Sequence, residues 1–275
     1  MNSFADNPLK RVDSLMAVHN FYLAQLECEK IIYLSDDNLL TAKVLLLKSN
    51  CYKQLDDFKS ASKTLSRVNF YNLPDSIHYS IRYESALCSY LIQEFEFAEH
   101  QIDLMNNYIK DTSLVNQSLL LQVLVFNETK KWKNAHQTAL KFVHLSELSD
   151  QEKDSIIYYI DMYYSQPPKI KSPHKAQKYS TFFPGLGQIY TGNTAEGVLN
   201  FTLHLFSLGV AGISFYYKYY LTGYFGGLAL LQRFYYGGIN RAEHLANKYN
   251  HEKCRSFNDS IKNVLLKTEA FYSIP

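Results

Sequence analysis

Hydrophobic residues in the first part of the chain recur at spacings of three, four and seven, which is the period of an α-helix. An aromatic residue followed three positions later by alanine occurs four times, at a constant step of 37 residues. The four pairs are Phe21/Ala24, Phe58/Ala61, Phe95/Ala98 and Trp132/Ala135. A small residue of this kind is expected where two antiparallel helices approach closely. The pattern predicts four helical hairpins, closed by a capping helix at residues 150–164.

The repeated pattern resembles the tetratricopeptide repeat family over about residues 8–164. The second unit carries the resemblance best, with large, small and aromatic residues at the positions that the family uses. These residues are Leu45, Ser49, Tyr52, Phe58, Ala61 and Leu65. The step of 37 residues is longer than the ~34 residues usual in that family. The resemblance implies a helical solenoid in which the first helix of each hairpin lines a concave groove.

The residues expected to line this groove form an apolar strip with few charges. They are Leu46, Asn50, Tyr83, Leu87, Tyr90, Leu120 and Leu124. An apolar groove suits an amphipathic helix, supplied either by a partner or by the chain's own tail. The alternative is that these residues belong to the core between repeats, because solenoids bury similar stripes.

A different hydrophobic pattern follows in the last third of the chain. From Gly197 to Tyr217 there are 21 residues without a charge, and Arg233 is the only charged residue in 219–240. A helix of this length spans about 31 Å, which matches a hydrocarbon layer of about 30 Å. All 11 glycines of the chain lie between Gly185 and Gly238, and small residues let membrane helices approach closely. We predict a two-helix transmembrane hairpin with spans at about 197–217 and 219–240; the alternative is a buried hairpin in a soluble protein.

Small and polar residues are predicted to form one face on each span. The main residues of these faces are Asn200, His204, Ser207, Gly223, Gly227 and Arg233, with Gly223 and Gly227 forming a G-x-x-x-G pair. We expect the two faces to meet. A turn near Lys218 would then bring Arg233 level with His204 and Asn200 in a buried polar cluster.

A glycine-rich motif precedes the first span. It reads P-G-L-G-Q-I-Y-T-G, and its defining residues are Pro184, Gly185, Gly187, Gln188, Tyr190 and Gly192. Residues 178–245 resemble, through this motif, a family of small bacterial two-helix membrane domains that are often fused to tetratricopeptide-type repeats. The resemblance implies no activity. The motif predicts a short helix at the membrane interface over residues 182–192, starting at Pro184 and ending at Gly192.

Charge separates the same two regions. Residues 1–166 carry a net charge of −5 and residues 167–275 a net charge of +7. Lysines and arginines flank both sides of the predicted hairpin, whereas its tip has only Lys218, so we expect both ends of the hairpin to be cytoplasmic. This predicts a bacterial inner-membrane protein with cytoplasmic repeats, or periplasmic repeats if a signal peptide has been removed. The expected domains are 1–165 (repeats), 166–180 (an extended basic, proline-containing linker), 181–240 (membrane domain) and 241–275 (an amphipathic helix).

The sequence contains no pattern typical of a catalytic centre, a cofactor site, a metal site or a nucleic-acid partner. The four cysteines are widely spaced, so neither a zinc site nor a disulfide framework is predicted. We therefore favour a non-enzymatic, membrane-anchored adaptor whose repeats bind a protein or peptide. One alternative is a transport or assembly component that oligomerises through the hairpin, with the repeats as a regulatory cap. Another is an enzyme with a polar site around His204 and Arg233.

Overall fold

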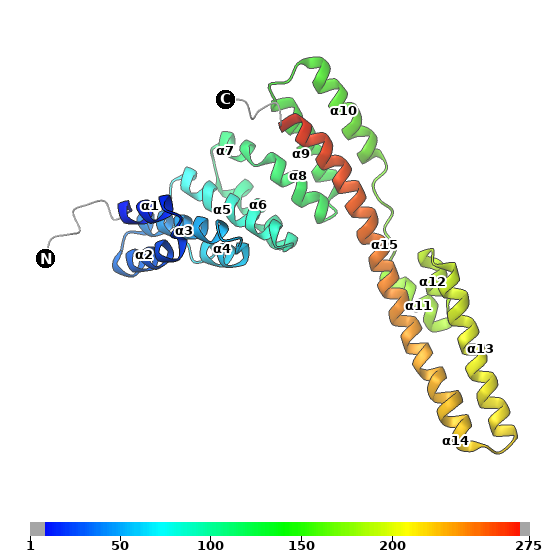
Figure 1. The fold of residues 1–275 in the computed structure, drawn as a ribbon. Coiled ribbons are helices and arrows are strands. Elements are labelled where there is room, and N and C mark those ends of the chain that lie inside the picture. Colours follow the sequence, from blue (N-terminus) through cyan, green and yellow to red (C-terminus); the bar gives the residue numbers. More distant parts are fainter. Residues whose placement is uncertain (1–8, 270–275) are drawn as a thin grey trace. The chain divides into compact units, whose positions relative to one another are not determined.

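The computed structural model describes residues 9–269, and every regular element in that range is helical (Figure 1). The all-α class is therefore confirmed. Contacts divide the chain into two compact units, one formed by Met1–Ser165 with Ile261–Pro275 and the other by Gln166–Ser260. The terminal stretches 1–8 and 270–275 of the predicted domains lie outside the described residues.

Paired helices build the first unit. The pairs are α1 (Lys10–Ala17) with α2 (Phe21–Leu34), α3 (Asn38–Lys53) with α4 (Phe58–Leu65), α5 (Asp75–Leu91) with α6 (Phe95–Tyr108), and α8 (Leu119–Glu128) with α9 (Trp132–Leu145). A short helix α7 (Thr112–Gln117) precedes α8, and α10 (Asp150–Ser165) packs on α9. The second helix of each pair begins at the aromatic residue of the repeated pattern. The alanine three positions later is fully buried in all four pairs, because side-chain bulk there would hold the helices apart.

One turn geometry joins the two helices of every pair. The residue two positions before each aromatic has a left-handed backbone; these residues are His19, Asp56, Gln93 and Lys130. The next backbone N–H then reaches back five residues, as from Glu94 to the carbonyl of Ser89 at 2.9 Å. This is the bonding of a Schellman cap, which satisfies the last carbonyls of the first helix and starts the second helix at once. None of the four positions is glycine, the residue that most often occupies such a cap.

Replacing Gln93 with glycine is expected to stabilise the first unit by about 0.5–1 kcal/mol. An L-residue in the left-handed region costs roughly 1–2 kcal/mol, and glycine removes that cost while losing somewhat more backbone entropy on folding. Chemical denaturation of the full-length protein would measure the change. The matched control His100→Gly, in the interior of α6, should instead destabilise by up to about 1 kcal/mol. A loss of stability in Gln93→Gly would contradict the prediction.

A carboxylate on α2 ties the first two helical pairs together. Glu29 accepts hydrogen bonds from Lys48, whose side chain is almost buried, and from Arg67. The hydrogen bonds from Arg67, followed by those from Lys48, lower the pKa of Glu29 to about 2. The ion pairs therefore persist in moderately acidic solution.

Stability of the first unit should fall in acid because of Glu29. Its pKa in the folded state is about 2 against an ordinary value of 4.5, so the stabilisation is complete above pH 4.5, decreases as the pH falls and is lost below about pH 2. Glu29→Gln should flatten this part of a plot of unfolding free energy against pH. Asp154→Asn, which changes an exposed carboxylate on α10, is the control and should leave the slope as it is. Equal slopes for wild type and Glu29→Gln would contradict the assignment.

The second unit contains a cluster of short helices and a long helical hairpin. Its elements are α11 (Pro173–Phe182), α12 (Leu186–Thr191), α13 (Thr194–Tyr216), α14 (Tyr220–Thr222), a π-helix (Gly223–Leu228) and most of α15 (Ala229–Glu269). Contacts join α11 to α12, α12 to α13, and α13 to the π-helix. Ala176, Ala242 and Ala246 form a small core against Tyr190. We call residues 194–240 the hairpin.

Two predicted boundaries are wrong. The extended linker 166–180 ends early, because Ser172 caps α11 by accepting from the Lys175 N–H at 3.3 Å and Pro173 occupies the first turn. The predicted separate helix at 241–275 is instead the continuation of α15, which runs without a break from Ala229. Its last described residues, from Ile261 on, group with the first unit, and Ile261 and Leu265 are fully buried.

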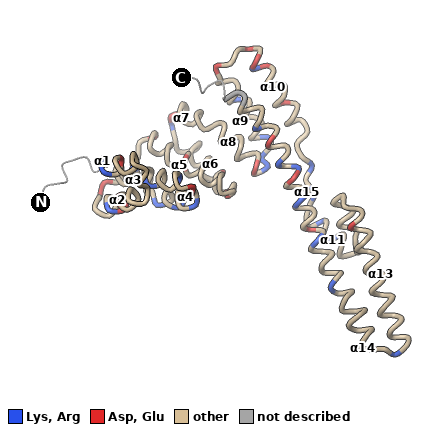
Figure 2. The backbone as a smooth tube through the Cα atoms, in the orientation of Figure 1, with Lys and Arg blue, Asp and Glu red and all other residues tan. Residues whose placement is uncertain are grey.

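Only one helix in residues 9–269 is long and apolar enough to cross a membrane. It is α13, which has 23 residues and a mean hydropathy of 1.6 over its most apolar stretch of 18 residues. After its first turn it carries no charged residue, as the uniform tan tube shows (Figure 2). The second predicted span is divided among α14, the π-helix and the start of α15. It therefore does not form a separate helix that meets this criterion.

Candidate functional site

All seven predicted groove residues on the repeats are half-buried. Three of them, Leu46, Asn50 and Tyr83, line a cavity of about 410 Å³. The remaining lining residues are Tyr79, Ser80, Glu84 and Gln117. The other four predicted residues, Leu87, Tyr90, Leu120 and Leu124, do not line this cavity.

Aromatic faces and neutral hydrogen-bonding groups dominate the groove cavity. Tyr79 and Tyr83 stack with ring centroids 5.7 Å apart. Burial raises the pKa of Tyr79 to about 12, so its hydroxyl stays neutral at physiological pH. The carboxylate of Glu84 is paired with Lys53 at 2.5 Å. Such a surface can hold a peptide, and it contains no activated nucleophile.

One of the missed groove residues had a sequence signal. Tyr79 lies one turn before Tyr83 on α5, at the i, i+4 spacing that places both on the same helix face. Gln117 had none, because it reaches the cavity only through the break between α7 and α8 at Ser118.

The four cysteines and the acidic residues form no reactive cluster in the described chain. All four thiols are buried and unlinked. Burial raises the pKa of Cys88 to about 11 and that of Cys28 to about 12, which disfavours the nucleophilic thiolate. Within residues 9–269 no three His, Cys, Asp or Glu side chains are grouped as metal ligands would be.

The glycine-rich motif forms a tightly packed junction in the second unit. Gly185 and Gly192 have φ angles of +92° and +95°, so they hold the left-handed ends of α12. A Cβ added to Gly187 would lie 2.1 Å from the carbonyl oxygen of Ala176, and one on Gly185 would lie 2.1 Å from that of Gly197. Gly185 and Gly187 are therefore required by close backbone packing, and Gly192 is required by its left-handed backbone.

Gln188 joins three helices of this junction while being 1% exposed. Its Nε2 donates to the Gly238 carbonyl on α15 at 2.9 Å, and its Oε1 accepts from Ser180 Oγ on α11 at 3.1 Å. The Gly187 N–H in turn donates to Ser180 Oγ at 3.2 Å. A buried amide with both ends bonded fixes how these helices pack.

The other motif residues extend the junction. Tyr190 accepts a hydrogen bond from the Ser172 N–H at 3.2 Å and meets Tyr179 edge to face. The ammonium of Lys171 lies 4.1 Å from the centre of the Tyr249 ring. Pro184 lines a separate cavity of about 440 Å³ with His204.

The predicted helix-packing face of α13 lies inside the hairpin. His204 and Ser207 are buried, Asn200 is half-buried, and a Cβ on Gly227 would lie 2.5 Å from the Cα of Ala211. The side chains of His204 and Ser207 bond to backbone carbonyls of their own helix. His204 Nδ1 lies 2.8 Å from the carbonyl oxygen of Asn200, and Ser207 Oγ donates to the carbonyl of Leu203. Gly223 is also buried and packs on the Phe215 ring.

The buried polar cluster predicted around Arg233 is wrong, because Arg233 is exposed. The π-helix places one extra residue in the turn before α15 and so rotates the following residues relative to a continuous α-helix. Gly227, Phe234 and Gly238 face α13; they lie 4, 11 and 15 residues after Gly223, close to whole turns of a helix, whereas Arg233 lies 10 residues after it. Arg233 and His204 line different cavities, so no joint polar site of the kind imagined for an enzyme is formed.

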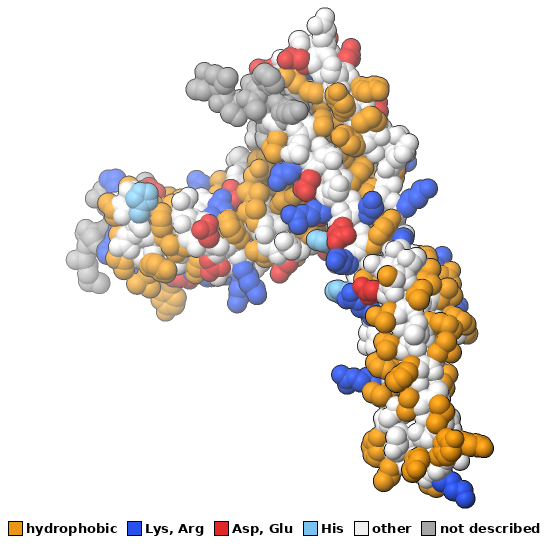
Figure 3. Space-filling view, turned by 45° about the vertical axis from the view of Figure 1, so that its right-hand side comes forward, with side chains coloured by type: hydrophobic (Ala, Val, Ile, Leu, Met, Phe, Trp, Pro, Cys, Tyr) orange, Lys and Arg blue, Asp and Glu red, His pale blue; other side chains and the backbone are white. Residues whose placement is uncertain are grey.

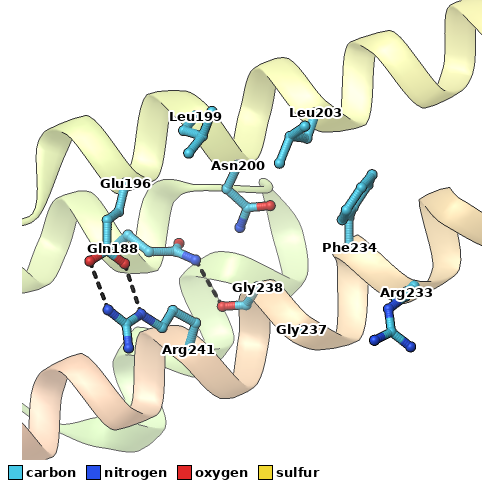
Figure 4. Close-up of a pocket in the computed structure, with 10 residues that line it drawn as sticks. All are labelled: Gln188, Glu196, Leu199, Asn200, Leu203, Arg233, Phe234, Gly237, Gly238 and Arg241. Atoms are coloured by element: carbon cyan, nitrogen blue, oxygen red, sulfur yellow. Dashed lines mark hydrogen bonds and ion pairs between the residues drawn. The ribbon is translucent and has the colours of Figure 1, made fainter.

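A cavity of about 610 Å³ lies beside the motif, between α13 and α15 (Figure 4). It is lined by Gln188, Glu196, Leu199, Asn200, Leu203, Arg233, Phe234, Gly237, Gly238 and Arg241. Arg241 and Glu196 form two hydrogen bonds of 2.8 Å across its end. Arg233 stands at the edge of the cavity and points away from Asn200 (Figure 4).

Comparisons of the chain with models of protein families, with curated proteins and with solved structures found no match. The two resemblances stated from the sequence therefore stay predictions, and function has to be argued from the geometry of the two units.

Proposed function

We propose that this protein is a membrane-anchored, non-enzymatic adaptor that binds a protein or peptide on its helical repeats. In this proposal α13 and the helical segment 219–240 cross the bilayer as a two-helix hairpin. The repeats form a tetratricopeptide-like solenoid at the cytoplasmic face of a bacterial inner membrane, because lysines and arginines flank the hairpin.

The observation that carries the proposal is the reversed polarity of the hairpin. Large apolar residues point outward, with Phe206 63%, Ile213 64% and Leu221 77% exposed. Polar His204 and Ser207 are instead 5% and 0% exposed. Hydrophobic side chains cover much of the visible hairpin surface (Figure 3). An apolar patch of this extent is unfavourable in water and favourable in lipid, and the inward-facing His204 and Ser207 bond to carbonyls of their own helix.

The partner-binding part of the proposal rests on the groove cavity. Tyrosine faces beside an apolar leucine, with neutral amide and hydroxyl groups, are typical of surfaces that recognise peptides. The competing oligomerisation hypothesis relied on Gly223 and Gly227. Both glycines pack inside the hairpin, against Phe215 and Ala211, which leaves that hypothesis without this support.

Two measurements test the proposal. Full-length protein should float with phosphatidylcholine vesicles in a density gradient and resist extraction by alkaline carbonate; recovery in the soluble fraction would refute anchoring. A photoreactive residue at Tyr79 should cross-link one discrete protein in native membranes, and Tyr83→Ala should abolish that product. A photoreactive residue at Tyr33, which is 89% exposed on α2, is the control position. The same products from both positions would refute groove-specific binding.

A further inference from the structure

We infer that the cavity between α13 and α15 binds the phosphate group of an anionic membrane phospholipid, with Arg233 as its charged partner. The inference rests on the proposed function, because it requires that the hairpin lie in a bilayer. The cavity combines a cation, an uncharged hydrogen-bonding group and an apolar wall. These complement the negative phosphate, the glycerol oxygens and the acyl chain of an anionic lipid.

Arg233 is a charge at a depth where a charge needs a counterion. The Glu196–Arg241 pair connects the start of α13 to α15 and marks one rim of the hairpin. Arg233 precedes Arg241 by two helical turns, which places it about 12 Å farther along the helix, toward the middle of the membrane. Among the described residues no acidic side chain pairs with Arg233, whereas Arg241 is neutralised by Glu196. The cavity therefore carries one uncompensated positive charge.

A phospholipid supplies that counterion with the right geometry. A guanidinium fork binds phosphate oxygens through two parallel hydrogen bonds, and a long arginine side chain can extend toward the headgroup level. Leu199, Leu203 and Phe234 line the same cavity and offer an apolar wall for the acyl chain. The half-buried amide of Asn200, from which Arg233 points away, can donate to a glycerol oxygen of the same lipid. A lipid with one net negative charge balances the single free cation.

Gly237 keeps the cavity open between the two arginines. It lies one turn after Arg233 and one turn before Arg241, and it is exposed. A Cβ added there would meet no atom within 4 Å, so helix packing does not require glycine at this position. Its neighbour Gly238 differs, because a Cβ there would lie 2.2 Å from the Asn200 amide. What distinguishes Gly237 from other open glycines is that it lines the cavity, where its missing side chain leaves room for a ligand group.

The test is lipid retention by full-length protein in detergent, read by native mass spectrometry after incubation with equal amounts of phosphatidylglycerol and phosphatidylcholine. Wild type should retain one phosphatidylglycerol with a preference of about fivefold, the effect of roughly one arginine near an anionic headgroup. Arg233→Gln and Gly237→Leu should both reduce the preference to about onefold. Gly212→Leu, at an equally open glycine on α13 outside the cavity, and Lys218→Gln, at the hairpin tip, should retain it.

An unchanged preference in Arg233→Gln, or an equal loss in Gly212→Leu, would overturn the inference. Displacement of the bound lipid by millimolar inorganic phosphate would show a site for free phosphate instead. A dimer that depends on Arg233 would show that a second copy is the occupant. Flotation of the same samples separates the two proposals. Protein that floats without lipid preference removes only the lipid site, and protein that does not float removes the membrane anchor itself.

Discussion

Gly227→Ala should loosen the hairpin, lowering its stability by about 2–3 kcal/mol, the usual effect of forcing an extra methyl group into a closely packed contact. The new Cβ would lie 2.5 Å from both the Cα and the Cβ of Ala211 and 2.7 Å from its nitrogen. Because two of these are backbone atoms, the two helices must move apart. The midpoint of unfolding in mixed micelles of increasing dodecyl sulfate content, followed by tryptic cleavage after Arg233, would measure the loss.

The adjacent glycine provides a matched control. A Cβ on Gly226 would have its nearest neighbours at 3.8 Å, which is ordinary van der Waals contact. Gly226→Ala should therefore leave the midpoint unchanged or raise it slightly, since alanine is the better helix former. Equal midpoints for the two variants would show that the contact between Gly227 and Ala211 does not determine hairpin stability.

Gln188→Leu should destabilise the second unit by about 2–4 kcal/mol. The substitution removes both hydrogen bonds of the amide. The Gly238 carbonyl then lacks the donor Nε2, and the Ser180 hydroxyl lacks the acceptor Oε1, in a buried site. Each unsatisfied buried group costs roughly 1–3 kcal/mol. Thermal unfolding of the full-length protein in detergent, monitored by proteolysis of residues 166–260, would report the change.

Gln232→Leu is the control for this substitution, because Gln232 is an exposed glutamine on α15. Its effect should stay within about 0.5 kcal/mol, as for most surface changes. If the two leucine variants unfold at the same temperature, the Gln188 network contributes no net stability to the junction.

The helical character of the chain could be predicted from the sequence, whereas the structure showed that the aromatic of each repeated pair begins a helix. Phe21, Phe58, Phe95 and Trp132 each begin a helix, and the alanine after each aromatic is fully buried. These features depend on local periodicity and on side-chain size, and both can be read from the order of residues in the sequence. The groove was located less well, because three of its seven predicted residues line the cavity and Gln117 reaches it only through the break at Ser118.

The sequence by itself therefore determined the helices, the position of the apolar span and the residues of the glycine-rich motif. It also identified the close-packed face of α13, since polar and small residues recur there at helical spacing. These properties follow from the order of neighbouring residues along one element.

Only the tertiary structure decided that Arg233 lies outside the face with which the second helical segment of the hairpin packs on α13. The segment Gly223–Leu228 is a π-helix, the face that begins at Gly223 continues through Gly227 and Gly238, and Arg233 lies outside this face. A helix adopts this local irregularity when packing against its neighbour stabilises it, here through the contact of Gly227 with Ala211. Ala211 lies 16 residues before Gly227, so the order of residues within the segment does not show which residue Gly227 contacts.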